Sequence, residues 1–190
     1  MILQRITSLL LLAAAALVFV YSLGIITDVY DSLYLVSSYK ETSSMYVEGS
    51  YVYLHMQEFN KSLTTAGIIL ILTAVALFVF QTNNRRRYYI ANYITIGVNA
   101  VANVVVSIWA LINVFKYKAE FLSVDFEKLK KISELLPDSV AYTESTFWFD
   151  ASIVVFGIVF AATALSITNL VFKIVLMSNE KKLLAEGKEA

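Results

Sequence analysis

The sequence predicts an all-α integral membrane protein built as a four-transmembrane-helix bundle, and three observations predict it. Of the 190 residues, 58% are hydrophobic and only 16% are charged, whereas an average soluble domain has about 25% charged residues. Four stretches are long enough to cross about 30 Å of hydrocarbon as helices, which takes about 20 residues. These stretches are continuously apolar rather than alternating, which favours helices over the strands of a barrel.

The four predicted spans cover residues of about 6–26, 63–80, 89–115 and 149–177. The first three contain no charged side chain, and the fourth contains only Asp150 near its start and Lys173 near its end. The first apolar run is about 21 residues long, longer than the ~7–15 residues of a signal-peptide core. We therefore expect it to remain as a span.

Lysine and arginine near the span ends predict the orientation. Arg85, Arg86 and Arg87 lie in the short loop 81–88, on the same side as the N-terminus and the tail 178–190. With Lys173 near the end of the fourth span, this side carries 8 basic and 3 acidic residues, and with Asp150 near the start of that span the opposite side carries 7 basic and 12 acidic residues. The positive-inside rule therefore places both termini and the arginine loop in the cytoplasm, where the arginines can also contact anionic lipid. The absence of cysteine and the short loops favour a prokaryotic plasma membrane.

The two outer loops, 27–62 and 116–148, are predicted to form a small, mainly helical ectodomain. Apolar residues recur at helical spacing in the second loop and predict an amphipathic helix: Leu122, Phe126, Leu129, Ile132 and Leu136. Ser123 is its expected N-cap and Pro137 its expected stop.

Two interpretations remain for the first outer loop. Leu54, Phe59 and Leu63 continue the second span outward as a helix, which is the favoured interpretation. Alternatively, residues 45–53 form a β-hairpin that turns near Gly49.

The outer loops also supply a candidate partner surface, since exposed aromatic clusters often mark interfaces. Its predicted members are Tyr46, Tyr51, Tyr53, Phe126 and Leu129. Tyrosines at a membrane boundary also serve as interfacial anchors, which is the simpler role for them.

Polar residues follow one face of the third span and a matching stripe on the fourth. We call them the polar seam: Asn92, Asn99, Asn103, Ser107, Ser166 and Asn169. Amides are costly in hydrocarbon, so this face is expected to point away from lipid. The favoured interpretation is that the seam joins the third and fourth spans by hydrogen bonds. The alternative is that it lines a solute path, although these spans have no carboxylate, histidine or arginine at mid-membrane depth.

The composition also limits the possible chemistry. The chain has no cysteine and a single histidine, His55, which excludes thiolate sites and makes a catalytic triad improbable. It contains no nucleotide-binding or protease motif. We therefore expect no catalytic residue, no cofactor and no metal. The balanced charge argues against a nucleic-acid partner.

The layout of four spans with cytoplasmic termini is similar to that of tetraspanins and claudins. The similarity is in topology alone, because those families depend on cysteine pairs in their outer loops. We expect a non-catalytic accessory, assembly or scaffold subunit of a larger membrane complex, for transport or for the envelope. Its partners would be the lipid bilayer and other membrane subunits or further copies of itself. A small stand-alone channel or transporter is the alternative, and a membrane-embedded enzyme is the third option.

Overall fold

The structure is a computed structural model that describes residues 2–81 and 89–189, with side chains for 3–80 and 91–179. It is 81% helical, and the described residues contain no strand. Four helices are long and apolar enough to span a membrane: α1 (Ile2–Gly24), α3 (Val52–Gln81), α4 (Tyr89–Phe121) and α6 (Phe147–Glu189). The predicted all-α class with four apolar helices is confirmed, and each predicted span falls on one of them.

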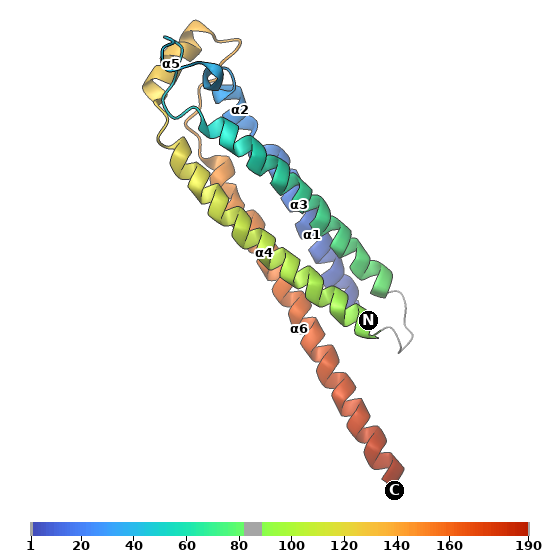
Figure 1. The fold of residues 1–190 in the computed structure, drawn as a ribbon. Coiled ribbons are helices and arrows are strands. Elements are labelled where there is room, and N and C mark those ends of the chain that lie inside the picture. Colours follow the sequence, from blue (N-terminus) through green and yellow to red (C-terminus); the bar gives the residue numbers. More distant parts are fainter. Residues whose placement is uncertain (1, 82–88, 190) are drawn as a thin grey trace.

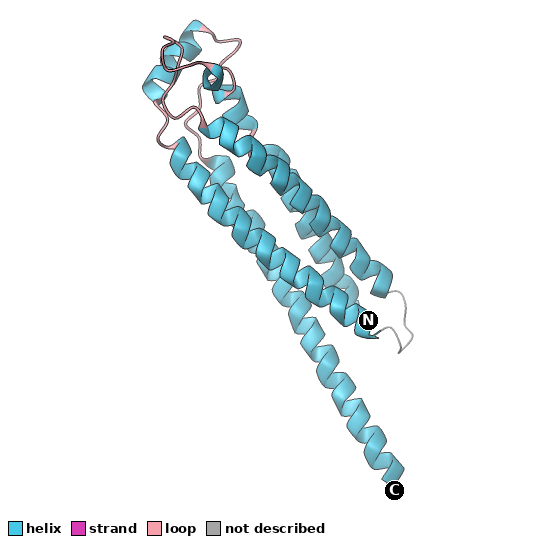
Figure 2. Ribbon diagram, in the orientation of Figure 1, coloured by secondary structure: helices cyan, strands magenta, loops and turns pink. Residues whose placement is uncertain are grey.

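The four long helices form a bundle in which neighbours along the chain run antiparallel (Figure 1). α1 packs against α3 and α6, and α4 packs against the same two helices. Both chain termini lie towards one end, here called the terminal end. The opposite loop end carries α2 (Thr27–Leu33), the short 3-10 helix η1 (Val36–Ser38) and α5 (Phe126–Leu135), joined by irregular segments (Figure 2).

The first loop is helical where it leads into the second span. α3 begins at Val52, about three turns before the predicted span, so the helical interpretation is confirmed and the hairpin is wrong. Gly49 still turns the chain, with a φ of 80°, and its backbone approaches Val124 so closely that a Cβ would lie 2.9 Å from the Val124 Cα. Only glycine fits that turn without strain.

Two backbone hydrogen bonds tie the loops together. The Asp125 amide donates to the Glu48 carbonyl over 3.1 Å, and the Ala141 amide donates to the Asp31 carbonyl over 3.0 Å. We call the joined segments, residues 25–51 and 122–146, the loop cap.

The amphipathic helix of the second loop is present as α5, with Leu129 and Ile132 buried. Its predicted N-cap is wrong: the Asp125 carboxylate accepts from the Lys128 amide over 3.0 Å, and Ser123 Oγ donates instead to the Glu120 carbonyl. The reason is that α4 continues to Phe121. Residues 122–125 therefore form the turn between α4 and α5, and Ser123 lies in this turn rather than at the start of α5.

Large aromatic side chains fill the bundle interior near the loop end. Tyr21, Phe121, Phe149 and Phe156 are all buried there. The Phe121 and Phe149 rings lie 5.4 Å apart, Tyr21 meets Phe156 edge-on at 6.0 Å, and the Tyr21 hydroxyl donates to the Trp148 carbonyl over 2.9 Å. This half of the interior is closed by apolar packing.

Candidate functional sites

The polar seam faces the interior of the bundle. All six of its side chains are between 0 and 6% exposed, as expected for groups that avoid hydrocarbon. The sequence therefore identified the buried faces of α4 and α6 in this region.

The hydrogen bonds of the seam do not join the helices that were expected. Asn99 Nδ2 donates to Thr73 Oγ1 on α3 over 2.9 Å, and Asn103 Nδ2 donates to Asn99 Oδ1 over 3.1 Å. Asn92 Oδ1 accepts from Gln4 Nε2 on α1 over 2.8 Å. The prediction that these amides bond the third span to the fourth is corrected, because helical spacing identifies a buried face but not which neighbour lies opposite it.

The register of α4 against α6 is fixed near both ends. Lys118 Nζ lies 2.6 Å from Asp150 Oδ1 near the loop end, and the Tyr93 hydroxyl lies 3.0 Å from Met177 Sδ near the terminal end. Because the two helices are antiparallel, each step forward on α4 from one of these contacts corresponds to a step backward on α6. Three pairs of polar residues therefore lie at the same height in the bundle: Ser107 with Thr163, Asn103 with Ser166, and Asn99 with Asn169.

Three buried polar atoms on these levels have no hydrogen-bond partner: Ser107 Oγ, Thr163 Oγ1 and Asn169 Nδ2. Each unpartnered buried group costs about 1–3 kcal/mol. The α4–α6 contact therefore contains polar groups that find no hydrogen-bond partner among the described residues.

The buried amide side chains lie in the half of the bundle near the terminal end, whereas the buried hydroxyls of Ser22 and Ser152 lie nearer the loop end. α1 contributes Gln4, Thr7 and Ser8 to the terminal half, all buried. Sequence reasoning missed Gln4 because the first span was taken to begin at Ile6. The signal available was that Gln4 lies one helical turn before Ser8, on the same face.

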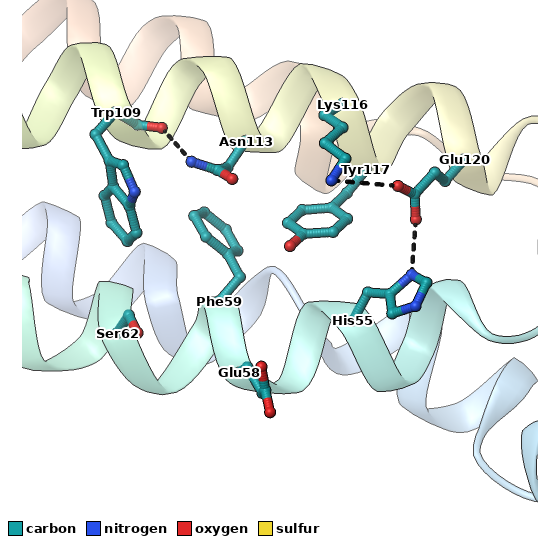
Figure 3. A pocket seen from close by; sticks show the side chains of 9 residues that line it. All are labelled: His55, Glu58, Phe59, Ser62, Trp109, Asn113, Lys116, Tyr117 and Glu120. Carbon is teal, nitrogen blue, oxygen red and sulfur yellow. Dashed lines mark hydrogen bonds and ion pairs between the residues drawn. The ribbon is translucent and has the colours of Figure 1, made fainter.

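A groove opens between α3 and α4 near the loop end (Figure 3), with a volume of about 360 Å³. It is lined by four residues of α3 and five of α4: His55, Glu58, Phe59, Ser62, Trp109, Asn113, Lys116, Tyr117 and Glu120. The sequence analysis did not predict it, because its two walls come from segments more than forty residues apart.

The floor of the groove is aromatic. Phe59 points from α3 towards α4 and lies between Trp109 and Tyr117, with ring centroids 5.3 Å from each. Phe59 and Tyr117 are buried, while Trp109 is exposed at its edge.

Charged groups of both signs stand at the rim. The Glu120 carboxylate accepts a hydrogen bond from His55 Nδ1 at 3.1 Å and forms an ion pair with Lys116 Nζ at 3.8 Å. The side chains of His55 and Lys116 are both exposed. Glu58 adds a second exposed carboxylate on the α3 side. The Asn113 amide donates to the Trp109 carbonyl over 2.8 Å and presents its oxygen as an acceptor.

Small residues form a stripe on the outward face of α6. Gly157, Ala161, Ala164 and Thr168 are exposed at helical spacing. A Cβ built on Gly157 would meet nothing within 4 Å. The sequence pattern Gly157-x-x-x-Ala161 is therefore not used for packing within the described part of the chain.

The structure divides the candidate partner surface. Tyr53 and Leu129 are buried, Tyr46 and Phe126 are half-buried, and Tyr51 is 39% exposed. Partial desolvation, and then the nearby Glu41 carboxylate, raise the pKa of the Tyr46 phenol above its usual range. A partner role for this set stays a prediction. The exposed area that the set offers is smaller than it would be if all five side chains were exposed.

Two exposed tyrosines lie next to this set. Tyr30 of α2 and Tyr34, which directly follows this helix, stack with ring centroids 5.0 Å apart, and both meet Tyr53 edge-on. Neither was predicted to belong to the candidate partner surface.

Arg85, Arg86 and Arg87, predicted to set topology and contact anionic lipid, lie outside the described residues. Within the described residues, no group of three or more histidine, aspartate or glutamate side chains is arranged to hold a metal ion. Comparison with protein-family models, with characterised proteins and with solved structures finds no match for the chain.

Proposed function

We propose that this protein is a non-catalytic accessory or assembly subunit that packs against another membrane protein through the outward face of α6. The observation that carries the proposal is the stripe of Gly157, Ala161, Ala164 and Thr168, exposed on a helix apolar enough to span a membrane. Small residues let helix backbones approach closely, and in lipid such packing is a main source of helix association.

The course of α6 supports the same interface. The helix continues past the other three at the terminal end (Figure 1). Between Val171 and Leu176, apolar residues are exposed on most sides of the helix, including Phe172 and Ile174. This stretch offers a second helix a long apolar contact that the described part of the chain leaves exposed.

The test places a large side chain in the stripe at a position where its Cβ meets no other described part of the chain. Gly157→Leu fills the stripe, and Gly97→Leu is the matched control, because the Cβ position of Gly97 on α4 also meets nothing within 4 Å. Both variants are tagged, extracted in mild detergent and isolated together with whatever remains bound.

We expect the wild-type chain and Gly97→Leu to retain one membrane protein in constant stoichiometry and Gly157→Leu to lose it. Retention by Gly157→Leu, or isolation of all three as a lone chain, would refute the proposal. Isolation of a homo-oligomer that Gly157→Leu dissociates would keep the interface and replace the accessory role with self-association.

A small channel or transporter is the second candidate function. The observation that favours it is the set of buried, unpartnered atoms on Ser107, Thr163 and Asn169, which could bind a polar solute. Against it, the aromatic half of the interior is closed by Tyr21 and Phe156. An Asn103→Leu protein that folds with wild-type stability but loses a measured flux would support this candidate over the subunit.

A further inference from the structure

We propose that the groove between α3 and α4 binds the headgroup of a zwitterionic phospholipid that carries a phosphate and a primary ammonium, as a phosphatidylethanolamine does. The inference rests on the placement of the four long helices in a bilayer. It does not depend on the partner assigned to α6.

The depth of the groove fits a headgroup. Its apolar floor is close to the ends of the uncharged runs: Phe59 lies three residues before that of α3 begins at Ser62, and Trp109 lies six residues before that of α4 ends at Phe115. Its charged rim, His55, Lys116 and Glu120, lies nearer the loop end (Figure 3). Aromatic residues with polar groups beyond them are typical of the headgroup level of a membrane.

The size of the groove fits a headgroup but not a whole lipid. A volume of about 360 Å³ is at the small end of the ~300–1,000 Å³ range for ligand pockets. The acyl chains would lie outside it, along exposed apolar residues that follow the walls towards the terminal end. Ile69 continues the α3 wall two turns beyond Ser62, and Val105 continues the α4 wall one turn beyond Trp109; both are exposed.

The charges select the class of headgroup. Lys116 can turn from its 3.8 Å contact with Glu120 to a lipid phosphate, since lysine binds phosphate as a mobile point charge. Glu58 and Glu120 can accept from an ammonium, with the Asn113 amide oxygen as a further acceptor. Two carboxylates against one lysine disfavour a lipid with net negative charge.

The hydrogen-bonding capacity distinguishes a primary ammonium from a choline. A quaternary ammonium has no N–H to donate, and it is held by an open cage of aromatic faces. Here Phe59 and Tyr117 are buried, and only Trp109 is exposed at the groove. The acceptors, rather than the rings, are the groups available to a cation.

The experiment uses the purified full-length chain in detergent, with lipids of identical acyl chains and different headgroups. Native mass spectrometry measures how much phosphatidylethanolamine, phosphatidylcholine and phosphatidylglycerol each variant retains from an equimolar mixture. The variants are Glu58→Gln and Lys116→Gln. The matched controls are Glu127→Gln and Lys128→Gln on α5, outside the groove. The melting temperature of each variant reports whether it is folded.

We expect the wild type and both controls to prefer phosphatidylethanolamine. Glu58→Gln should weaken that preference about fivefold, because Glu58 faces the ammonium. Lys116→Gln should lower the retention of all three lipids about fivefold, because the phosphate that Lys116 binds is common to them. Such a factor is a modest part of what a charge-assisted hydrogen bond contributes. Equal retention of the three lipids by the wild type would overturn the proposal. So would an unchanged preference in Glu58→Gln together with unchanged retention in Lys116→Gln, both at unchanged melting temperature.

Two further arms identify other occupants. Preferential retention of phosphatidylglycerol would assign the groove to anionic lipid and contradict the charge argument.

In the second arm, soluble phosphoethanolamine is added as a competitor to the lipid-loaded protein. Displacement of lipid at equal concentration would mean that the acyl chains contribute nothing, so that the ligand is a soluble phosphoamine and not a lipid. Retention of the lipid is the result that the proposal requires.

Discussion

Replacement of Asn99 by leucine is expected to be the most damaging single change in the polar seam. Leucine has the same number of side-chain heavy atoms, so the change removes hydrogen bonds without leaving a large cavity. Asn99 takes part in two bonds, donating to Thr73 on α3 and accepting from Asn103. Asn103 takes part in only the second of them.

The magnitude follows from what each replacement leaves behind. Asn99→Leu removes an interhelical bond worth about 0.6–1.7 kcal/mol, and it strands the buried Asn103 amide, which costs about 1–3 kcal/mol. The Thr73 hydroxyl is not left without a partner by this change, because it also donates to the Leu70 carbonyl over 3.0 Å. Asn103→Leu leaves the buried Asn99 Oδ1 without its donor, which also costs about 1–3 kcal/mol. We therefore expect Asn99→Leu to lower the free energy of unfolding by about 2–4 kcal/mol, and Asn103→Leu by about 1–3 kcal/mol.

The assay is equilibrium unfolding of the purified chain in mixed micelles with increasing sodium dodecyl sulfate, followed by circular dichroism. The double mutant Asn99→Leu/Asn103→Leu should be less destabilised than the sum of its parts, since both single changes remove the same bond. A cycle of Asn99→Leu with Thr73→Val measures the α3–α4 bond directly. Val101→Ala, on the exposed face of α4, is the control.

Two results would refute this reasoning. Asn103→Leu could cost more than Asn99→Leu, which would mean that Asn103 makes an interaction beyond its bond to Asn99. Alternatively, Thr73→Val and Asn99→Leu could be strictly additive, which would mean that no bond joins α3 to α4 at this level.

Three other changes test the loop cap, a charge pair and the orientation. Gly49→Ala should destabilise the cap by about 1–2 kcal/mol, because its φ of 80° places a Cβ in a costly conformation, and limited proteolysis of the cap should become faster. Lys118→Met should cost at most about 1 kcal/mol, and the cost should disappear when Asp150 is already replaced by Asn; a full loss in the double variant would contradict the pairing. A cysteine at Lys130 should react with an impermeant reagent in intact cells and one at Lys188 should not; labelling of position 188 from outside would reverse the predicted orientation.

Much of the fold could be predicted from the sequence, because lipid imposes a simple rule on apolar runs. A continuous uncharged stretch of about 20 residues has few alternatives to a helix, and all four such stretches are helices. The outward extension of α3 was also predictable, since residues 52–62 contain no proline or glycine and keep helical apolar spacing. The cap was harder, since it depends on contacts between two loops, such as the bond from Asp125 to Glu48.

The sites could be predicted only in part, for a physical reason that is the same in each case. The period of a helix shows which residues share a face, and it identified Asn99 and Asn103 as buried. It does not show which helix lies opposite, so the bond to Thr73 could not be foreseen. The groove could not be predicted for the same reason. Nothing in the sequence relates Phe59 to Trp109, and the two meet only because α3 and α4 lie side by side.

The division of the bundle interior bears on both proposed functions. Towards the terminal end the interior presents amides and hydroxyls, while towards the loop end it is closed by Tyr21, Phe149 and Phe156. A solute path would need a rearrangement that separates these aromatic side chains, which together bury several hundred Å² of apolar surface. A subunit needs no such movement, because the contacts proposed for it, at the α6 stripe and in the groove between α3 and α4, lie on the exterior. Packing of a polar interior that holds α1 and α3 onto α4 is sufficient to explain the buried amides. The functional surfaces are therefore sought on the exterior of the bundle.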